Sequence, residues 1–150
     1  MGFAARPIRG QWRTVEFDTT STATFGKGAL VALGGARTLA EATVGSPSIV
    51  GIALQASVDS FPSGKVQVAC PRGYDAVFEI GIQTGVAASA ISIGECYTME
   101  KSGNTQRLDA DSQASAFFQI VGTPNVSARS VVECVFLTNI LVLPSESSSL

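Results

Sequence analysis

The sequence contains no histidine, the side chain that most often exchanges protons near neutral pH. This absence excludes catalytic sites built on Ser-His-Asp or Cys-His groups, and we predict that the protein is not an enzyme. Its three cysteines, Cys70, Cys96 and Cys134, lie far apart and form no CxxC pair. We therefore predict no metal site and no cofactor. Each cysteine lies in an apolar run, which favours buried thiols.

Charged residues are also scarce. They make up 15% of the 150 residues, against 45% hydrophobic residues, and the mean hydropathy is +0.30. Because such a surface has apolar area to cover, we expect an obligate homo-oligomer, for example a homotrimer, rather than a monomer. The net charge of −2 provides no basic field for nucleic acid. The most apolar run, VVECVFLTNILVL, contains Glu133 and Asn139 and is shorter than the ~20 residues of a membrane span, so we expect no membrane partner.

Short apolar or alternating runs follow one another along the chain, bounded by Gly, Pro, Ser, Asn or Asp, which is typical of strands joined by turns. Gly34-Gly35 predicts a two-residue hairpin turn. The spacing predicts an all-β fold, a small β-sandwich or barrel-like domain of short antiparallel strands. The expected strands are WRTVEF, ALVAL, RTLAEA, SIVGIAL, KVQVAC, AVFEI, CYTME, AFFQIV and SVVECVFL.

A pattern repeats inside the chain. From Gly28 the order is glycine, apolar strand, turn and LAEA, with IVG following; from Gly94 it is glycine, ECYTME, a longer turn, LDAD and again IVG. We therefore expect a single β domain over residues 14–143 that holds two similar β units, at about 25–80 and 90–137. The final residues, 144–150, predict a disordered tail.

Three carboxylates form the one candidate cation site. Asp109 and Asp111 are two residues apart on an extended run, and Glu100 is expected across a hairpin from them. Three such groups could hold a calcium ion. The sequence LDADSQAS is also typical of a solvated turn, and we favour that interpretation.

Residues 1–13 differ from the rest of the chain because arginines, Pro7 and Gly10 precede the first regular strand. This composition predicts an extended, flexible N-terminal arm. Its guanidinium groups suit an acidic partner surface, with apolar side chains as anchors, and the alternative is a frayed terminus. The candidate binding residues are Phe3, Arg6, Ile8, Arg9, Trp12 and Arg13.

The run FGKGALVALGGARTLAEATVGSPSIVGIALQASVDSFPSGKVQVACPRGYDAVFEI resembles bacteriophage capsid decoration proteins, also called cement or head-stabilising proteins. In many of these an apolar strand after a glycine leads to a turn, a VGIAL segment, a glycine turn and VQVA. The resemblance covers about Phe25 to Ile80. It implies a structural virion protein that clusters, for example as a trimer, on the outer capsid surface and holds neighbouring major capsid protein subunits together. It also implies that the N-terminal arm becomes ordered on the capsid.

Location and function leave alternatives. The start, MGFAARPIRGQWR, lacks the apolar stretch of a signal peptide, so we expect synthesis in the host bacterial cytoplasm and assembly onto the virion. A phage tail or fibre component would share the β content. A carbohydrate-binding β module would need an exposed row of aromatic side chains, and the sequence has one Trp and two Tyr.

Overall fold

The structure is a computed structural model, and the all-β prediction is confirmed by eleven strands within its described residues. The described residues are 5–19, 24–33, 38–42, 49–57, 64–72, 75–82, 90–102, 105–111, 116, 118–122 and 131–137. The strands are β1 (Arg6–Arg9), β2 (Trp12–Asp18), β3 (Leu30–Leu33), β4 (Leu39–Glu41), β5 (Ile49–Ala53), β6 (Lys65–Pro71), β7 (Val77–Gly81), β8 (Cys96–Ser102), β9 (Thr105–Asp109), β10 (Phe118–Gly122) and β11 (Val131–Phe136). No helix in these residues is long and apolar enough to cross a membrane.

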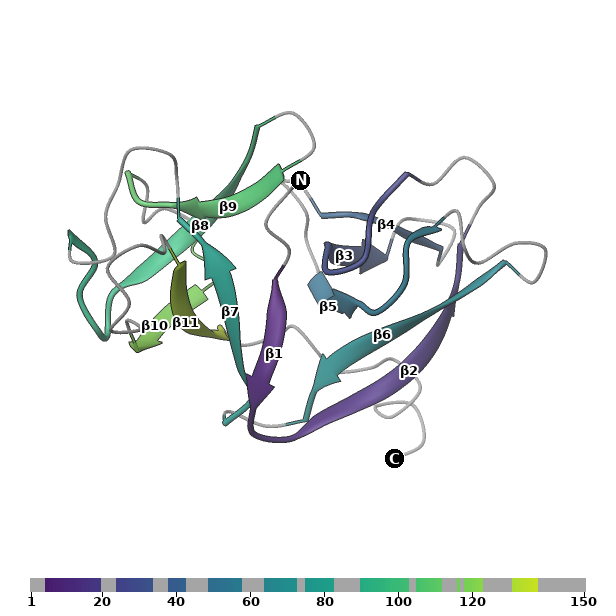
Figure 1. Ribbon diagram of the computed structural model, residues 1–150, viewed down its shortest axis with the longest axis horizontal. Helices are drawn as coiled ribbons and strands as arrows, with labels where there is room; N and C mark the ends of the chain where they lie inside the picture. The colour runs from purple at the N-terminus through teal and green to yellow at the C-terminus, as the bar shows by residue number, and fades with distance from the viewer. Residues whose placement is uncertain are drawn as a thin grey trace.

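The strands form two antiparallel sheets, which lie side by side in Figure 1. The six-stranded sheet has the order β1-β7-β11-β10-β8-β9, and the five-stranded sheet has the order β2-β6-β5-β3-β4. Within the described residues, all the strand pairs of both sheets are antiparallel, as expected for short strands joined by turns.

Apart from β1, the two sheets are built in the same way. The order β2-β6-β5-β3-β4 becomes β7-β11-β10-β8-β9 when each strand is replaced by its counterpart in the second half. Each five-stranded set also curls until its first and last strands meet, β2 with β4 and β7 with β9. Thr19, which follows β2, bridges to Leu39 in β4, and Ile82, which follows β7, bridges to Leu108 in β9. The chain therefore consists of one β unit from β2 to β6 and a second from β7 to β11.

Matching hydrogen bonds support this equivalence. Gly28 and Gly94 both have positive φ angles, 88° and 96°. The N–H of Gly28 donates to the carbonyl of Ala53 at 2.7 Å, and that of Gly94 donates to Ile120 at 2.8 Å. Ala53 and Ile120 each return a bond to the residue after the glycine, at 2.8 and 2.9 Å. The two IVG runs of the sequence are not equivalent, because Ala53 is the counterpart of Ile120.

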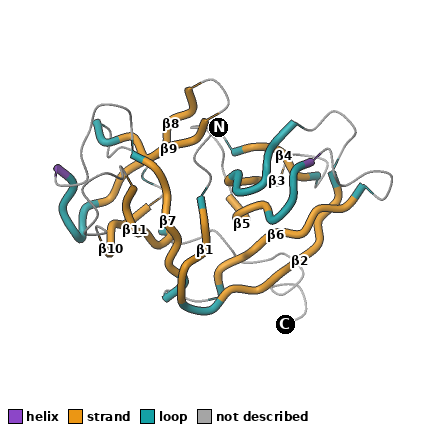
Figure 2. The backbone as a smooth tube through the Cα atoms, in the orientation of Figure 1, coloured by secondary structure: helices purple, strands orange, loops and turns teal. Residues whose placement is uncertain are grey.

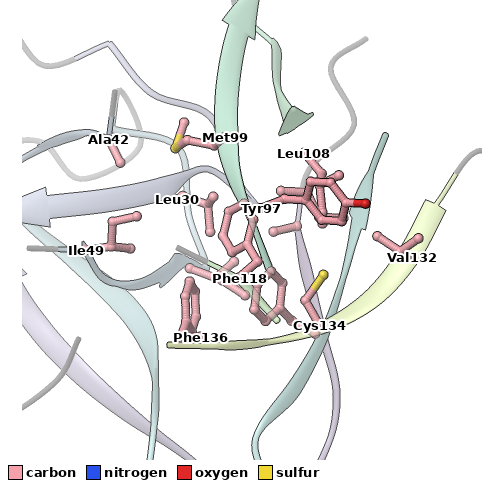
Figure 3. Close-up of a cluster of buried hydrophobic side chains, with 14 of the residues drawn as sticks. Leu30, Ala42, Ile49, Tyr97, Met99, Leu108, Phe118, Val132, Cys134 and Phe136 are labelled. Carbon is pink, nitrogen blue, oxygen red and sulfur yellow. The ribbon is translucent and has the colours of Figure 1, made fainter. Parts of the chain in front are cut away.

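Two apolar clusters form the core. The smaller one fills the inside of the curled five-stranded sheet and includes Val31, Val66 and Val68. The larger one covers the inner face of the six-stranded sheet and continues onto Leu30 and Ile49 of the first unit (Figure 3). Strands β3 and β5 are thus buried on both faces, which explains why their sequences, LVAL and IVGIA, are apolar throughout.

Polar contacts also join the two units. Gln106 in β9 is 6% exposed, and its carboxamide binds the backbone of the first unit. Its oxygen accepts from the N–H of Leu30 at 2.7 Å, and its nitrogen donates to the carbonyls of Leu30 and Ala42, both at 2.9 Å. Nearby in sequence, Lys101 forms an ion pair with Glu41 at 2.6 Å. A buried amide with all three groups bonded fixes how the units sit together.

The expectation of a free N-terminal arm is wrong for residues 5–13. Residues 6–9 form β1, which pairs with β7 at the edge of the six-stranded sheet, and β2 begins at Trp12 (Figure 2). Pairing with a strand 73 residues away in sequence overrides the polar composition of this segment. Residues 1–4 and the expected tail at 144–150 lie outside the described residues.

The strand pair predicted around Gly34-Gly35 is confirmed. The predicted turn length of two residues is wrong. Strands β3 and β4 are antiparallel, with Leu33 opposite Leu39, so the connection is longer than two residues. The two glycines themselves lie outside the described residues.

Candidate functional site

The candidate binding residues of the N-terminal segment form part of a row of charges across β1, β7 and β11. Arg6 lies opposite Glu79, and Glu79 lies opposite Glu133. The Nη2 atom of Arg6 is 3.2 Å from Oε1 of Glu79, and that of Arg9 is 2.8 Å from Oε1 of Glu133. We call Arg6, Arg9, Glu79 and Glu133 the charged row.

The charged row has a buried acidic side and an exposed basic side. The side chains of Glu79 and Glu133 are 11% and 21% exposed, whereas those of Arg6 and Arg9 are 61% and 55% exposed. Two carboxylates directly opposite each other repel, and the arginines offset this repulsion. Each guanidinium has five N–H donors in a fixed fork, so further donors remain for an acidic group of a partner.

The sequence interpretation missed the acidic half of this row. Glu79 and Glu133 each lie in an apolar strand, and their neighbours gave no reason to join them to β1. The one local signal for Glu133 is Gly122, which lies opposite it. A Cβ atom on Gly122 would come within 2.6 Å of the Glu133 carboxylate, so the glycine provides the space that this side chain fills.

Trp12 packs against the larger apolar cluster, beneath the charged row. The Trp12 ring makes edge contacts with Phe78 and Phe136, with centroids 6.4 Å apart in both cases, and its Nε1 donates to the carbonyl of Arg9 at 3.0 Å. Ile8 is half-buried in β1. Trp12 therefore holds the β1–β2 turn against the core. Less of its ring is available to a partner than would be the case in a free arm.

Arg13 and Phe3 do not join this group. Arg13 lies in β2 of the other sheet, opposite Cys70. Phe3 lies outside the described residues. Of the candidate binding residues, the structure thus brings together Arg6, Arg9 and Trp12, with the Trp12 ring beneath the two arginines.

The cysteines differ in their surroundings. Cys70 and Cys134 are buried, as expected, whereas Cys96 is half-exposed. Burial raises the pKa of the Cys70 thiol to about 12, with Arg13 opposing the shift slightly, and burial also raises the pKa of Cys134. Both buried thiols therefore stay protonated and unreactive near neutral pH.

The carboxylates considered for calcium are arranged as a turn. The N–H of Asp111 donates to Oδ1 of Asp109 at 3.0 Å, which is an Asx-type turn. Asp109 lies opposite Thr98, while Glu100 lies opposite Arg107. Within the described ranges, no three His, Cys, Asp or Glu side chains are grouped as metal ligands.

A tight turn presents the one large hydrophobic side chain that is exposed among the described residues. Ile93 is 66% exposed at the tip of a turn closed by a bond from the N–H of Glu95 to the carbonyl of Ser92 at 3.2 Å. The Glu95 carboxylate accepts from the Tyr97 hydroxyl at 2.6 Å and from the Ser92 N–H at 3.0 Å, and these bonds lower its pKa. A single exposed isoleucine is common on protein surfaces and defines no site.

Comparison with known proteins does not assign a family. No protein-family model matches the chain, and no curated protein is significantly similar to it in sequence.

Proposed function

We propose that the protein is a structural component of a bacteriophage virion that binds the outer surface of the icosahedral capsid. In this role it binds neighbouring subunits of the major capsid protein and acts as a homotrimer. The sequence likeness over about Phe25 to Ile80 supports this proposal, and so does the compact all-β architecture of two similar units.

The charged row is the observation that carries the proposal furthest. Arg6 and Arg9 are fixed by strand pairing and by ion pairs, yet more than half of each side chain is exposed. Side chains that are already ordered lose little conformational entropy on binding. The pair thus suits carboxylates on a coat protein surface, and a trimer would repeat a weak contact three times with a gain in effective concentration.

Binding to heads tests the proposal. Undecorated heads are assembled from the major capsid protein encoded by the same phage, and co-sedimentation is measured at two salt concentrations. The wild-type protein should bind, and more weakly at higher salt, because partly exposed charges are screened. Failure to bind such heads, or labelling of tails instead in electron micrographs, would contradict the proposal.

The variant must remove charge without unfolding the sheet. Replacing Arg6 alone deprives the mostly buried Glu79 of its ion pair, so the paired variant Arg6→Gln with Glu79→Gln is preferable. It should fold and bind heads about 1.4–5-fold more weakly per contact, as expected for a pair worth ~0.2–1 kcal/mol. The matched control is Lys27→Gln with Asp111→Asn, one exposed basic and one exposed acidic residue outside the charged row, which should bind like the wild type.

A further inference from the structure

We infer that the edge of β2 facing away from β6 binds an extended, arginine-bearing segment of a partner protein, which adds to the sheet as an antiparallel strand. The two equivalent β units carry this inference: in the second unit the corresponding edge is occupied by β1, and in the first unit it has no strand on it within the described residues. The inference does not rest on the capsid proposal, since any partner with such a segment satisfies it.

Strand β2 matches β7 residue by residue. Thr19 and Ile82 make the same closing bridge, and counting back three residues from each reaches Glu16 and Glu79. The flanking sequences agree, with Val-Glu-Phe in β2 and Phe-Glu-Ile in β7. The neighbouring strands keep the same register.

That register can be checked on the other side of each strand. Glu16 lies opposite Gln67 of β6, and Glu79 lies opposite Glu133 of β11. Both of these partners occupy the third position of their strands, in KVQVAC and VVECVF. The match of Glu16 with Glu79 therefore does not depend on the bridges alone.

The two matched glutamates, Glu79 and Glu16, differ in exposure. Glu79 lies under β1, opposite Arg6, and is 9% exposed. Glu16 is exposed, and so is Asp18 two residues along on the same face, whose side chain is 65% exposed. The β2 edge thus has the carboxylate of the β7 edge, with a second acidic group beside it, but no arginine-bearing strand in the described part of the chain.

The outer edges of β1 and β2 differ in how readily a further strand can pair with them. β1 contains Pro7, which lacks an N–H, and its register shifts between Pro7 and Arg9, both of which protect an edge from further pairing. β2 pairs with β6 in unbroken register from Trp12 to Asp18 and contains no proline. No strand of the described residues pairs with its other edge, and a regular edge of this kind is the basis of strand addition in peptide recognition.

The chemistry of the occupant follows from β1. An arginine directly opposite Glu16 would repeat the pairing of Arg6 with Glu79, next to Asp18, which already pairs with Lys65 of β6. Backbone bonds would provide most of the affinity, and the Glu16 carboxylate would select for positive charge.

A labelled peptide with the β1 sequence, Ala-Arg-Pro-Ile-Arg-Gly-Gln, tests the site on the full-length protein. Binding is measured by fluorescence anisotropy, and hydrogen exchange of β2 and β7 is followed with and without the peptide. We expect the β2 amides that point away from β6 to exchange at least about tenfold more slowly at saturation. Glu16→Lys should weaken binding about 3–10-fold, whereas the control Asp111→Lys, an exposed change of equal charge in the other unit, should not.

Three results would overturn the inference. Protection in β7 but not in β2 would show that the peptide only exchanges with β1. Full protection, in the free protein, of the β2 amides that point away from β6 would show that the edge is already covered, by another segment or by a second copy. Binding that is equally strong when both arginines of the peptide are replaced by glutamine would remove the assigned chemistry.

Discussion

Replacement of Gly10 by alanine tests the junction between the two units. Gly10 follows β1 with a φ of 84°, and a Cβ atom there would lie 1.8 Å from the carbonyl oxygen of Asp75, in the connection from β6 to β7. In the same place the N–H of Arg72 donates to the carbonyl of Gln11 at 2.9 Å. The substitution therefore strains the backbone and forces the two connections apart.

The magnitude can be worked from these two effects. The left-handed conformation costs an alanine ~1–2 kcal/mol. Separating the connections loses a hydrogen bond worth ~0.5–1.5 kcal/mol, together with packing of the turn. We expect Gly10→Ala to lower the free energy of unfolding by about 2–4 kcal/mol, which corresponds to a fall in Tm of roughly 5–15 °C for a chain of this size.

Urea and thermal unfolding measure this loss, and the chain offers a matched control. Gly94 has a φ of 96°, but a Cβ atom there would have nothing within 4 Å. Gly94→Ala should therefore lose only the conformational part, ~1–2 kcal/mol. Equal losses for the two variants would refute the close approach of the connections.

Three further predictions concern the interface between the units, the thiols and the N-terminal strand. Gln106→Leu should lower the free energy of unfolding by about 2–4 kcal/mol in urea titrations, because buried backbone groups of the first unit lose their bonds to the carboxamide. At pH 8 a thiol reagent should modify Cys96 in the native protein, while Cys70 and Cys134 should react only after unfolding, since burial raises the pKa of both thiols. These two thiols ionise near pH 8.5 in the unfolded chain but not in the native one, so stability should be unaffected by them at lower pH and fall as pH rises above about 8.5 in urea titrations. Deleting residues 1–11 should lower the free energy of unfolding by ~2 kcal/mol or more and speed hydrogen exchange in β7, because the deletion removes β1 and both of its ion pairs.

Hydrophobic patterning predicted the strands that line a core. Apolar residues in the sequence predict strands of this kind. Examples are β6, whose burial alternates, and β5, which is buried throughout. β1 was missed, and β9 was predicted only as an extended run at Asp109, because neither has a strong apolar pattern. β1, with the sequence RPIR, and β9, with TQRLD, carry little apolar surface and are ordered by pairing with β7 and β8. Tertiary pairing of this kind leaves no local pattern.

The candidate site was predictable only in its basic half. Arg6 and Arg9 stood out because they cluster near the start of the chain. Their partners, Glu79 and Glu133, are single charges within distant apolar strands, and only the register of the sheet brings the four together. The repeat from Gly28 and Gly94 was visible, but the shared strand order and the closing bridges required coordinates.

The position of β1 also constrains the order of events during synthesis. The strand leaves the ribosome before its ion-pair partners, which follow it by 73 and 124 residues. Until β7 and β11 have been translated, β1 has no sheet to join, and the apolar outer side of β3 and β5 has no second unit to cover it. The first unit therefore emerges with exposed apolar surface and unpaired edges, a state prone to aggregation. Slow translation of the second half should favour aggregation of nascent chains.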